Sequence, residues 1–153
     1  FYSFRNFLRL MRGGEAEQKV VDALSKLDDR YHIIRNYGFP GGDIDVLVVG
    51  PTGIFVFEVK SIKGKVKVDE KGVWYRGINF YDQLERCVRY VEEKLPPDLK
   101  THLKWGIVVD GGKIEGKGKK FVFRWWNVPK FVRKGKKVSM KDIESVLEAL
   151  GIS

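Results

Sequence analysis

The sequence predicts an α/β (α+β) fold, in which a single domain holds a central mixed β-sheet between helices. Two runs rich in β-branched and aromatic residues, 43–50 and 53–61, are separated only by Pro51-Thr52. This pattern predicts a hairpin, and because both strands are apolar on both faces we expect them in the middle of a covered sheet. Apolar residues recur at helical spacing over 14–27 and 79–95, on either side of the hairpin. A length of 153 residues and a hydrophobic content of 43% suit one domain with its own core.

The other elements follow from short local patterns. Gly13-Gly14 predicts a break before the first helix, and the Gly and Pro residues of 38–42 predict a loop. Ser139 is a typical N-cap for a final helix over 140–149. Stretches of β-branched and aromatic residues predict strands over 31–37, 64–69, 72–76, 103–110 and 120–128. Two of these, on either side of Glu70-Lys71, would form a second hairpin in the one mixed sheet.

The N-terminal end differs from the rest of the chain. Residues 1–12 form a basic amphipathic segment, with Arg5, Arg9 and Arg12 at helical spacing. Two interpretations stay open: a terminal helix packed on the domain, or a membrane-surface segment that follows an upstream anchor. Residues 13–153 then form a single domain, without an internal repeat or a linker that would divide it.

The net charge of +9 arises from 29 Lys and Arg against 20 Asp and Glu, and it suits a polyanion such as nucleic acid or an anionic membrane surface. The segment 111–137 holds ten basic residues and one acid, Glu115, so it carries as much net charge as the whole chain. Contacts of this kind position a duplex without reading its sequence. One cysteine excludes a disulfide framework and a multi-cysteine zinc site, and no apolar run is long enough to span a membrane.

Asp45 and Glu58 lie inside the two most apolar strands. An ionised carboxylate in such a place is costly unless it has a partner. One structural explanation is a buried salt bridge of Glu58 with Lys60 or Arg35, and another is a position at the edge of the sheet. The functional explanation is a shared site: if Pro51-Thr52 is a simple two-residue turn, Asp45 opposes Glu58, and Lys60 shares the face of Glu58.

The composition of the turn conflicts with this register. Pro51 cannot adopt the positive φ of a type I′ turn, whereas a type I turn with Gly53 in the left-handed region adds a bulge. Such a bulge shifts the pairing by one residue and turns the two carboxylates to opposite faces. A shared site would then require a second irregularity, which we expect at Gly41-Gly42 or near Asp45.

Two carboxylates at the expected separation repel each other, and a divalent cation removes the repulsion. Oxygen ligands with no His or Cys nearby favour Mg²⁺ or Mn²⁺. Such a metal polarises a phosphoryl oxygen and activates bound water, while Lys60 would hold or deprotonate the water or neutralise phosphate charge. In a basic protein, this acidic pocket predicts metal-assisted hydrolysis of a phosphodiester.

The order of these residues resembles the PD-(D/E)XK nuclease signature, because Glu58-Val59-Lys60 follows Asp45 after thirteen residues. The wider pattern is more specific. It comprises G-G-E at 13–15, then G-G-D-I-D-V-L-V-V-G-P-T-G-I-F-V-F-E-V-K-S-I-K-G, Trp74, and Gln83 in the next helix. This series resembles the nuclease-related domain, or NERD, family.

The resemblance covers the motif core 13–110, and the basic C-terminal extension 111–153 carries none of the motifs. It implies a restriction-endonuclease-like core, similar to that of Holliday-junction-resolvase-like nucleases. One departure from the signature is minor, since Ile44 rather than Pro precedes the first acid. Members of such superfamilies can lose activity while they keep the fold.

The resemblance also implies roles for individual residues. Asp45 and Glu58 would be the metal ligands, and Lys60 the catalytic lysine. Glu15, at the start of the first helix, would be the outlying acid that reaches a metal directly or through water. Gln83 would be the helical glutamine that orients water or substrate.

Several lysines are candidates for binding nucleic acid: Lys63, Lys65, Lys67, Lys117, Lys119 and Lys120. The first three would form a basic row directly after Lys60, although an edge strand with solubilising lysines is an equal alternative. Trp74, Trp125 and Trp126 could stack on bases, but packing in the core is the favoured interpretation.

The predicted function is that of an Mg²⁺- or Mn²⁺-dependent nuclease, by preference an endonuclease, with DNA as the favoured substrate. Two alternatives stay open: a catalytically inactive nucleic-acid-binding module with the same fold, and a membrane-tethered regulatory domain. Nucleic acid is the expected partner, while membrane association through the N-terminal segment and a homodimer stay open. We expect a cytoplasmic location, with the cytoplasmic face of a membrane as its variant.

Overall fold

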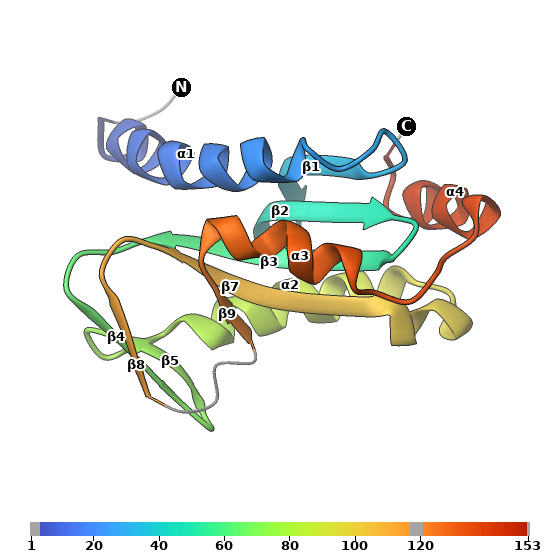
Figure 1. Cartoon of the computed structure of the whole chain (residues 1–153). Helices are drawn as coiled ribbons and strands as arrows, with labels where there is room; N and C mark the ends of the chain where they lie inside the picture. Colours follow the sequence, from blue (N-terminus) through green and yellow to red (C-terminus); the bar gives the residue numbers. More distant parts are fainter. Residues whose placement is uncertain (1–3, 117–120, 153) are drawn as a thin grey trace.

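The computed structural model describes residues 4–116 and 121–152, with the backbone alone for 4–13. Its strands form two sheets (Figure 1). The large sheet has the order β1-β2-β3-β7-β9, with the strands β1 (His32–Phe39), β2 (Gly42–Gly50), β3 (Gly53–Ser61), β7 (Leu103–Asp110) and β9 (Val122–Phe123). The small sheet has the order β6-β5-β4-β8, with the strands β4 (Lys65–Asp69), β5 (Gly72–Tyr75), β6 (Ile78–Asn79) and β8 (Lys113–Gly116).

Helices cover both faces of the large sheet and make three layers (Figure 1). They are α1 (Phe4–Leu24), α2 (Phe80–Lys94), α3 (Val128–Arg133) and α4 (Met140–Ala149), with the 3-10 helices η1 (Pro97–His102) and η3 (Trp125–Asn127). On one face, α2 and α4 contribute Leu84 and Ile143 to an apolar cluster. On the other face, α1 and α3 contribute Val20 and Val132 to a second cluster. The predicted α/β domain with a helix-flanked sheet is confirmed.

The large sheet is mixed, as predicted. β1, β2 and β3 pair in antiparallel fashion, whereas β3 pairs with β7 and β7 with β9 in parallel. The prediction of a single sheet is wrong, although β4 and β5 do pair across Glu70-Lys71. β4 takes β8 as its parallel neighbour, so the hairpin belongs to a separate sheet beyond the end of β3 (Figure 1).

The turn between β2 and β3 keeps the unshifted register. Gly50 pairs with Gly53, and Val46 pairs with Phe57. Gly53 has a φ of +138°, and a Cβ atom at this position would lie 2.6 Å from the carbonyl oxygen of His102. Glycine is therefore required there, as the turn composition indicated, but the positive φ does not shift the pairing.

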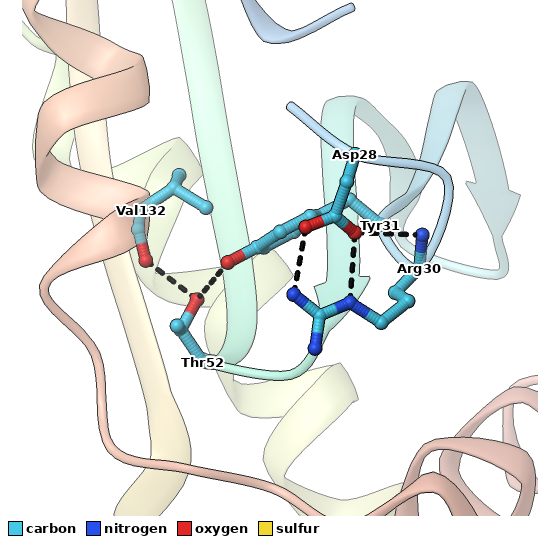
Figure 2. Close-up of polar contacts among 5 residues, drawn as sticks. All are labelled: Asp28, Arg30, Tyr31, Thr52 and Val132. Atoms are coloured by element: carbon cyan, nitrogen blue, oxygen red, sulfur yellow. Dashed lines mark hydrogen bonds and ion pairs between the residues drawn. The ribbon is translucent and has the colours of Figure 1, made fainter. Parts of the chain in front are cut away.

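Polar contacts fix this turn to α3 and to the start of β1 (Figure 2). The Thr52 hydroxyl donates to the carbonyl oxygen of Val132 at 2.6 Å and lies 3.2 Å from the hydroxyl of Tyr31. Just before Tyr31, the Arg30 guanidinium donates to both carboxylate oxygens of Asp28. The contacts of Thr52 lie roughly 20 Å along the strand from Asp45 and Glu58, so they stabilise the hairpin rather than the candidate site.

β1 and β2 change the face that they present at one point along their length. Ile44 and Leu47 pack on the α2 side of the sheet, whereas Val46 packs on the α1 side. Because residues two apart share a face in a regular strand, the alternation breaks between Ile44 and Val46. The β1–β2 ladder omits Asn36 and Asp45, and Asn36 has a left-handed φ of +53°. The irregularity expected near Asp45 is present, although the turn did not require it.

Two predictions of local structure are wrong at their boundaries. α1 continues through Gly13-Gly14 without a break, although each glycine costs a helix about 1 kcal/mol. β1 continues to Phe39, which pairs with Gly42. The predicted loop is therefore only Pro40-Gly41.

The predicted strand over 120–128 is also wrong, because the sheet keeps only the two residues of β9. Beyond them, the Arg124 side chain donates to the carbonyl oxygens of Val109, Gly111 and Gly112 at the end of β7. Pro129 stands in the first turn of α3, a position where proline favours a helix. The composition of 120–128 favours a strand, but Arg124 binds the end of β7 and Pro129 starts a helix.

The aromatic residues divide between core and surface. Trp125 packs against the α1-side cluster, as predicted, but Trp126 is 57% exposed and Trp74 belongs to neither cluster.

Cys87 is buried, and burial with the charges of nearby carboxylates raises the pKa of its thiol to about 12. Among the helices of the described part of the chain, none is long and apolar enough to cross a membrane.

Candidate active site

Asp45 lies where β2 and β3 separate. Counted from the turn, the last pair of the two strands is Val46 with Phe57, and Asp45 is the next residue of β2 beyond it. There Asp45 Oδ2 accepts the backbone N–H of Val59 at 2.8 Å, which continues the hydrogen bonding of β3 with a side chain. The carboxylate therefore reaches across the gap between the strands, at the level where β2 changes face.

Glu58 and Lys60 occupy the face that packs against α2. Glu58 is only 2% exposed, and its Oε1 lies 3.3 Å from Nζ of Lys60. The same Nζ donates to Oε1 of Gln83 on α2 at 3.1 Å and stands 5.2 Å from the centre of the Phe80 ring. The salt bridge considered from the sequence is thus present, and it is part of a larger polar group on this face.

Another carboxylate approaches from α1. Glu17 is 8% exposed, and its Oε2 lies 3.4 Å from Nε of Arg35 on β1. Arg35 also donates to Oε1 of Gln18 at 2.6 Å and to the carbonyl oxygen of Gly14 at 3.0 Å. Arg35 therefore pairs with Glu17 rather than with Glu58, and it holds α1 against β1.

Asp45 is close enough to both glutamates to change their protonation. Burial and then the charge of Asp45 raise the pKa of Glu58 to about 8, against the opposing effect of Lys60. Burial and the charge of Asp45 also raise the pKa of Glu17 to about 7, against the opposing effect of Arg35. Asp45 thus lies between two ion pairs, Glu58 with Lys60 on the α2 side and Glu17 with Arg35 on the α1 side.

The donor set fits a hard divalent cation held by two carboxylates. No group of three His, Cys, Asp or Glu side chains is arranged to hold a metal within the described ranges, so a closed protein cage is not present there. Mg²⁺ does not need one, because it commonly keeps several waters and takes one or two carboxylates. Asp45 and Glu58 are the pair whose mutual repulsion a cation would relieve, and Glu17 is a further acid beside Asp45.

A cavity of about 510 Å³ opens beside Lys60, between the end of β3 and the start of α2. Its charged lining residues are Lys60, Arg86 and Asp82, and its uncharged side chains include Gln83, Asn79 and Phe80. Lys60 is 27% exposed and thus connects the buried Glu58 with this cavity. An anionic group in the cavity would contact Lys60, whose ammonium group lies next to the carboxylate of Glu58.

Four of the five predicted catalytic residues form this group: Asp45, Glu58, Lys60 and Gln83. Glu15 does not, because it is exposed and has no hydrogen bond or ion pair to the other four. The structure places Glu17 against Asp45 instead. A signal for this was available, since Glu17 precedes Val20 and Leu24 by three and seven residues and so shares the buried face of the helix.

The predicted nucleic-acid contacts are distributed over the small sheet and beyond. Lys63, Lys65 and Lys67 are exposed, and the last two share the outer face of β4. Lys65 lies 3.5 Å from the carboxylate of Glu115 on β8. Three further candidates lie outside the described residues: Lys117, Lys119 and Lys120.

Comparison with known proteins gives one finding about this group of residues. The family model of the nuclease-related domain matches residues 12–122, which contain α1 from Arg12 onward, both sheets apart from Phe123, and the whole carboxylate cluster. No curated protein and no solved structure matches the chain. The resemblance seen in the sequence over 13–110 is confirmed. The chain belongs to the NERD, or nuclease-related domain, family.

Proposed function

We propose that this NERD domain is a metal-dependent nuclease that hydrolyses phosphodiester bonds in nucleic acid, with DNA as the favoured substrate. The observation that supports this most is the position of Asp45 at the face switch, against the buried Glu58 and next to Lys60. A buried glutamate whose pKa is raised by burial and by a neighbouring carboxylate destabilises the fold. A divalent cation bound between the two carboxylates would offset this cost.

Asp45 and Glu58 would hold Mg²⁺ or Mn²⁺. When bound, such an ion polarises a phosphoryl oxygen and lowers the pKa of a coordinated water. The ammonium group of Lys60, oriented by Gln83, would hold the attacking water or neutralise charge that develops on the phosphate. Glu17, held by Arg35, would accept a hydrogen bond from a water molecule on the α1 side of Asp45.

The charges around the site suit a nucleic-acid backbone. Arg86 lines the cavity beside Lys60, and Lys65 and Lys67 stand on the sheet that begins directly after β3. Contacts of such residues with phosphates would position a strand without reading its sequence. They would also make binding strongly dependent on salt.

The proposal is tested by cleavage of plasmid and of labelled oligonucleotides with Mg²⁺, with Mn²⁺ or with EDTA. We expect cleavage only with a metal, and a loss of roughly 10²–10⁴-fold for Lys60→Ala while binding of DNA is retained. Lys100→Ala, which removes an exposed lysine of η1, is the matched control and should leave cleavage unchanged. Binding without cleavage under any condition would refute the nuclease and favour a non-catalytic module. Unchanged cleavage by Lys60→Ala would refute the role of Lys60.

A further inference from the structure

The outer face of the small sheet combines an aromatic ring with lysines. Trp74 on β5 pairs across the ladder with Lys67 on β4, and Lys67 pairs in turn with Glu115 on β8. Residues at paired positions project from the same face of a sheet, so these three side chains stand in one row. On the next row, Lys65 is paired with Lys113.

Trp74 does not contribute to the core of the domain. Its neighbours along β5, Val73 and Tyr75, pack into the α2-side cluster, whereas Trp74 points to the opposite face and belongs to neither apolar cluster of the described residues. The alternation of β4 is the same, with Val66 and Val68 buried and the intervening lysine exposed. The two faces are thus separated into a buried apolar face and an outer face with one large aromatic residue.

The ring of Trp74 is held in one orientation. Its Nε1 donates to Oδ1 of Asp69 at 3.1 Å, and this oxygen also accepts the backbone N–H groups of Lys71 and Gly72 at 2.8 and 3.0 Å. The acceptor is therefore fixed by the turn between β4 and β5. A ring that is ordered before a ligand arrives loses little side-chain entropy when the ligand stacks on it.

Lysines of β4 and β8 lie on the same face as the ring, and two of them are paired with an acid. Lys65 and Lys113 lie 3.5 and 3.6 Å from the same carboxylate, that of Glu115. Lys67, directly opposite Trp74, has no acidic partner within 4.0 Å in the described part of the chain. Three lysines thus share the outer face with two carboxylates, those of Glu115 and Asp69. Lys67, the lysine opposite the ring across the ladder, is available to a phosphate.

We propose that the outer face of the small sheet binds an unpaired stretch of nucleic acid, in which a base stacks on Trp74 and the adjacent phosphates contact Lys67 and Lys65. An aromatic ring among cations on an open sheet face suits a single strand, because the π-face of an unstacked base is available to it. In a duplex the bases already stack on each other. The proposal rests on nucleic acid being the substrate in the proposed function, but it does not depend on cleavage.

The test measures binding in EDTA, where metal-dependent cleavage is absent. Anisotropy of a labelled oligothymidylate and of a duplex of equal length gives the affinity for each form at one fixed salt concentration. Trp74→Ala should weaken binding of the single strand by roughly 5- to 150-fold, because stacking on an aromatic side chain contributes about 1–3 kcal/mol per base. Trp74→Phe keeps a stacking surface and should lose much less. Trp126→Ala removes the 57% exposed tryptophan of η3 and is the matched control, which should bind as the wild type does.

Three results would overturn this proposal. They are an unchanged affinity of Trp74→Ala for the single strand, an equal loss for the duplex, and an equal loss in Trp126→Ala. If Trp74→Ala does not fold, Lys67→Glu decides, since an exposed lysine tolerates the change and the single strand should bind more weakly and with a smaller salt dependence. Binding of the single strand through Trp74 by a protein that never cleaves would refute the proposed nuclease and leave this inference intact.

Discussion

Replacing Glu58 by Gln should make the metal-free protein more stable at alkaline pH. Glu58 is buried in the face that packs against α2, where burial and the charge of Asp45 raise its pKa from the ordinary value of 4.5 to about 8. Gln has nearly the same shape, stays neutral at every pH and still offers an oxygen to Lys60. The substitution therefore removes a buried charge without creating a cavity.

The size of the effect follows from the pKa difference. Between about pH 4.5 and about pH 8 the folded protein binds a proton at Glu58 that the unfolded chain does not bind, so the free energy of unfolding falls as pH rises. The slope is at most about 1.4 kcal/mol per pH unit for one group. Ionisation of Glu58 lowers the free energy of unfolding of the wild type by roughly 3–5 kcal/mol in all. This loss is absent below about pH 4.5 and complete above about pH 8.

Urea unfolding in EDTA, followed by tryptophan fluorescence from about pH 5 to about pH 9, measures this directly. The difference in unfolding free energy between Glu58→Gln and the wild type should grow with pH, and histidine titration cancels because both proteins share it. Glu15→Gln, an exposed carboxylate of the same helix as Glu17, should follow the wild type. Addition of Mg²⁺ at alkaline pH should stabilise the wild type and not Glu58→Gln. A difference that does not change with pH would refute the reasoning.

Substitutions at three further positions separate catalytic roles from structural ones. Asp45→Asn should keep the fold, because its amide oxygen still accepts the backbone N–H of Val59, but it should lose cleavage. Asp45→Ala should lose cleavage and should also lower the free energy of unfolding, measured in urea, by about 1–2 kcal/mol. Glu17→Gln should lower metal-dependent cleavage by roughly tenfold or more and Glu15→Gln should not; the reverse order would return the role of outlying acid to Glu15. Thr52→Val should cost about 1 kcal/mol of unfolding free energy with cleavage unchanged, and a loss of cleavage would show that this distant turn acts on the site.

Local patterns were sufficient for the centre of the fold. The apolar strands 43–50 and 53–61 are observed as β2 and β3, in the register of a simple two-residue turn rather than in the shifted register that the turn composition favoured. Their pairing is encoded by neighbouring residues, so a sequence shows it. The placement of Asp45 beside Glu58 follows from the same local register.

The features that were missed, or expected for another reason, depend on distant parts of the chain. The irregularity near Asp45 was expected as compensation for a shifted turn, but its cause is Asn36 on β1, which takes a positive φ opposite Asp45, and no local pattern of β2 reveals this. The small sheet requires β8 to pair with β4 across more than forty residues. The choice of Glu15 over Glu17 was different in kind, because the helical spacing that buries Glu17 was already visible and was given less weight than the family pattern.

The central claim is that Asp45 and Glu58 together hold a divalent cation. Anomalous diffraction from crystals soaked in Mn²⁺ tests it most directly. We predict an anomalous peak between the two carboxylates in the wild type and its loss in Asp45→Asn. Crystals that show no peak there at saturating Mn²⁺, or a peak that persists in Asp45→Asn, would contradict the account.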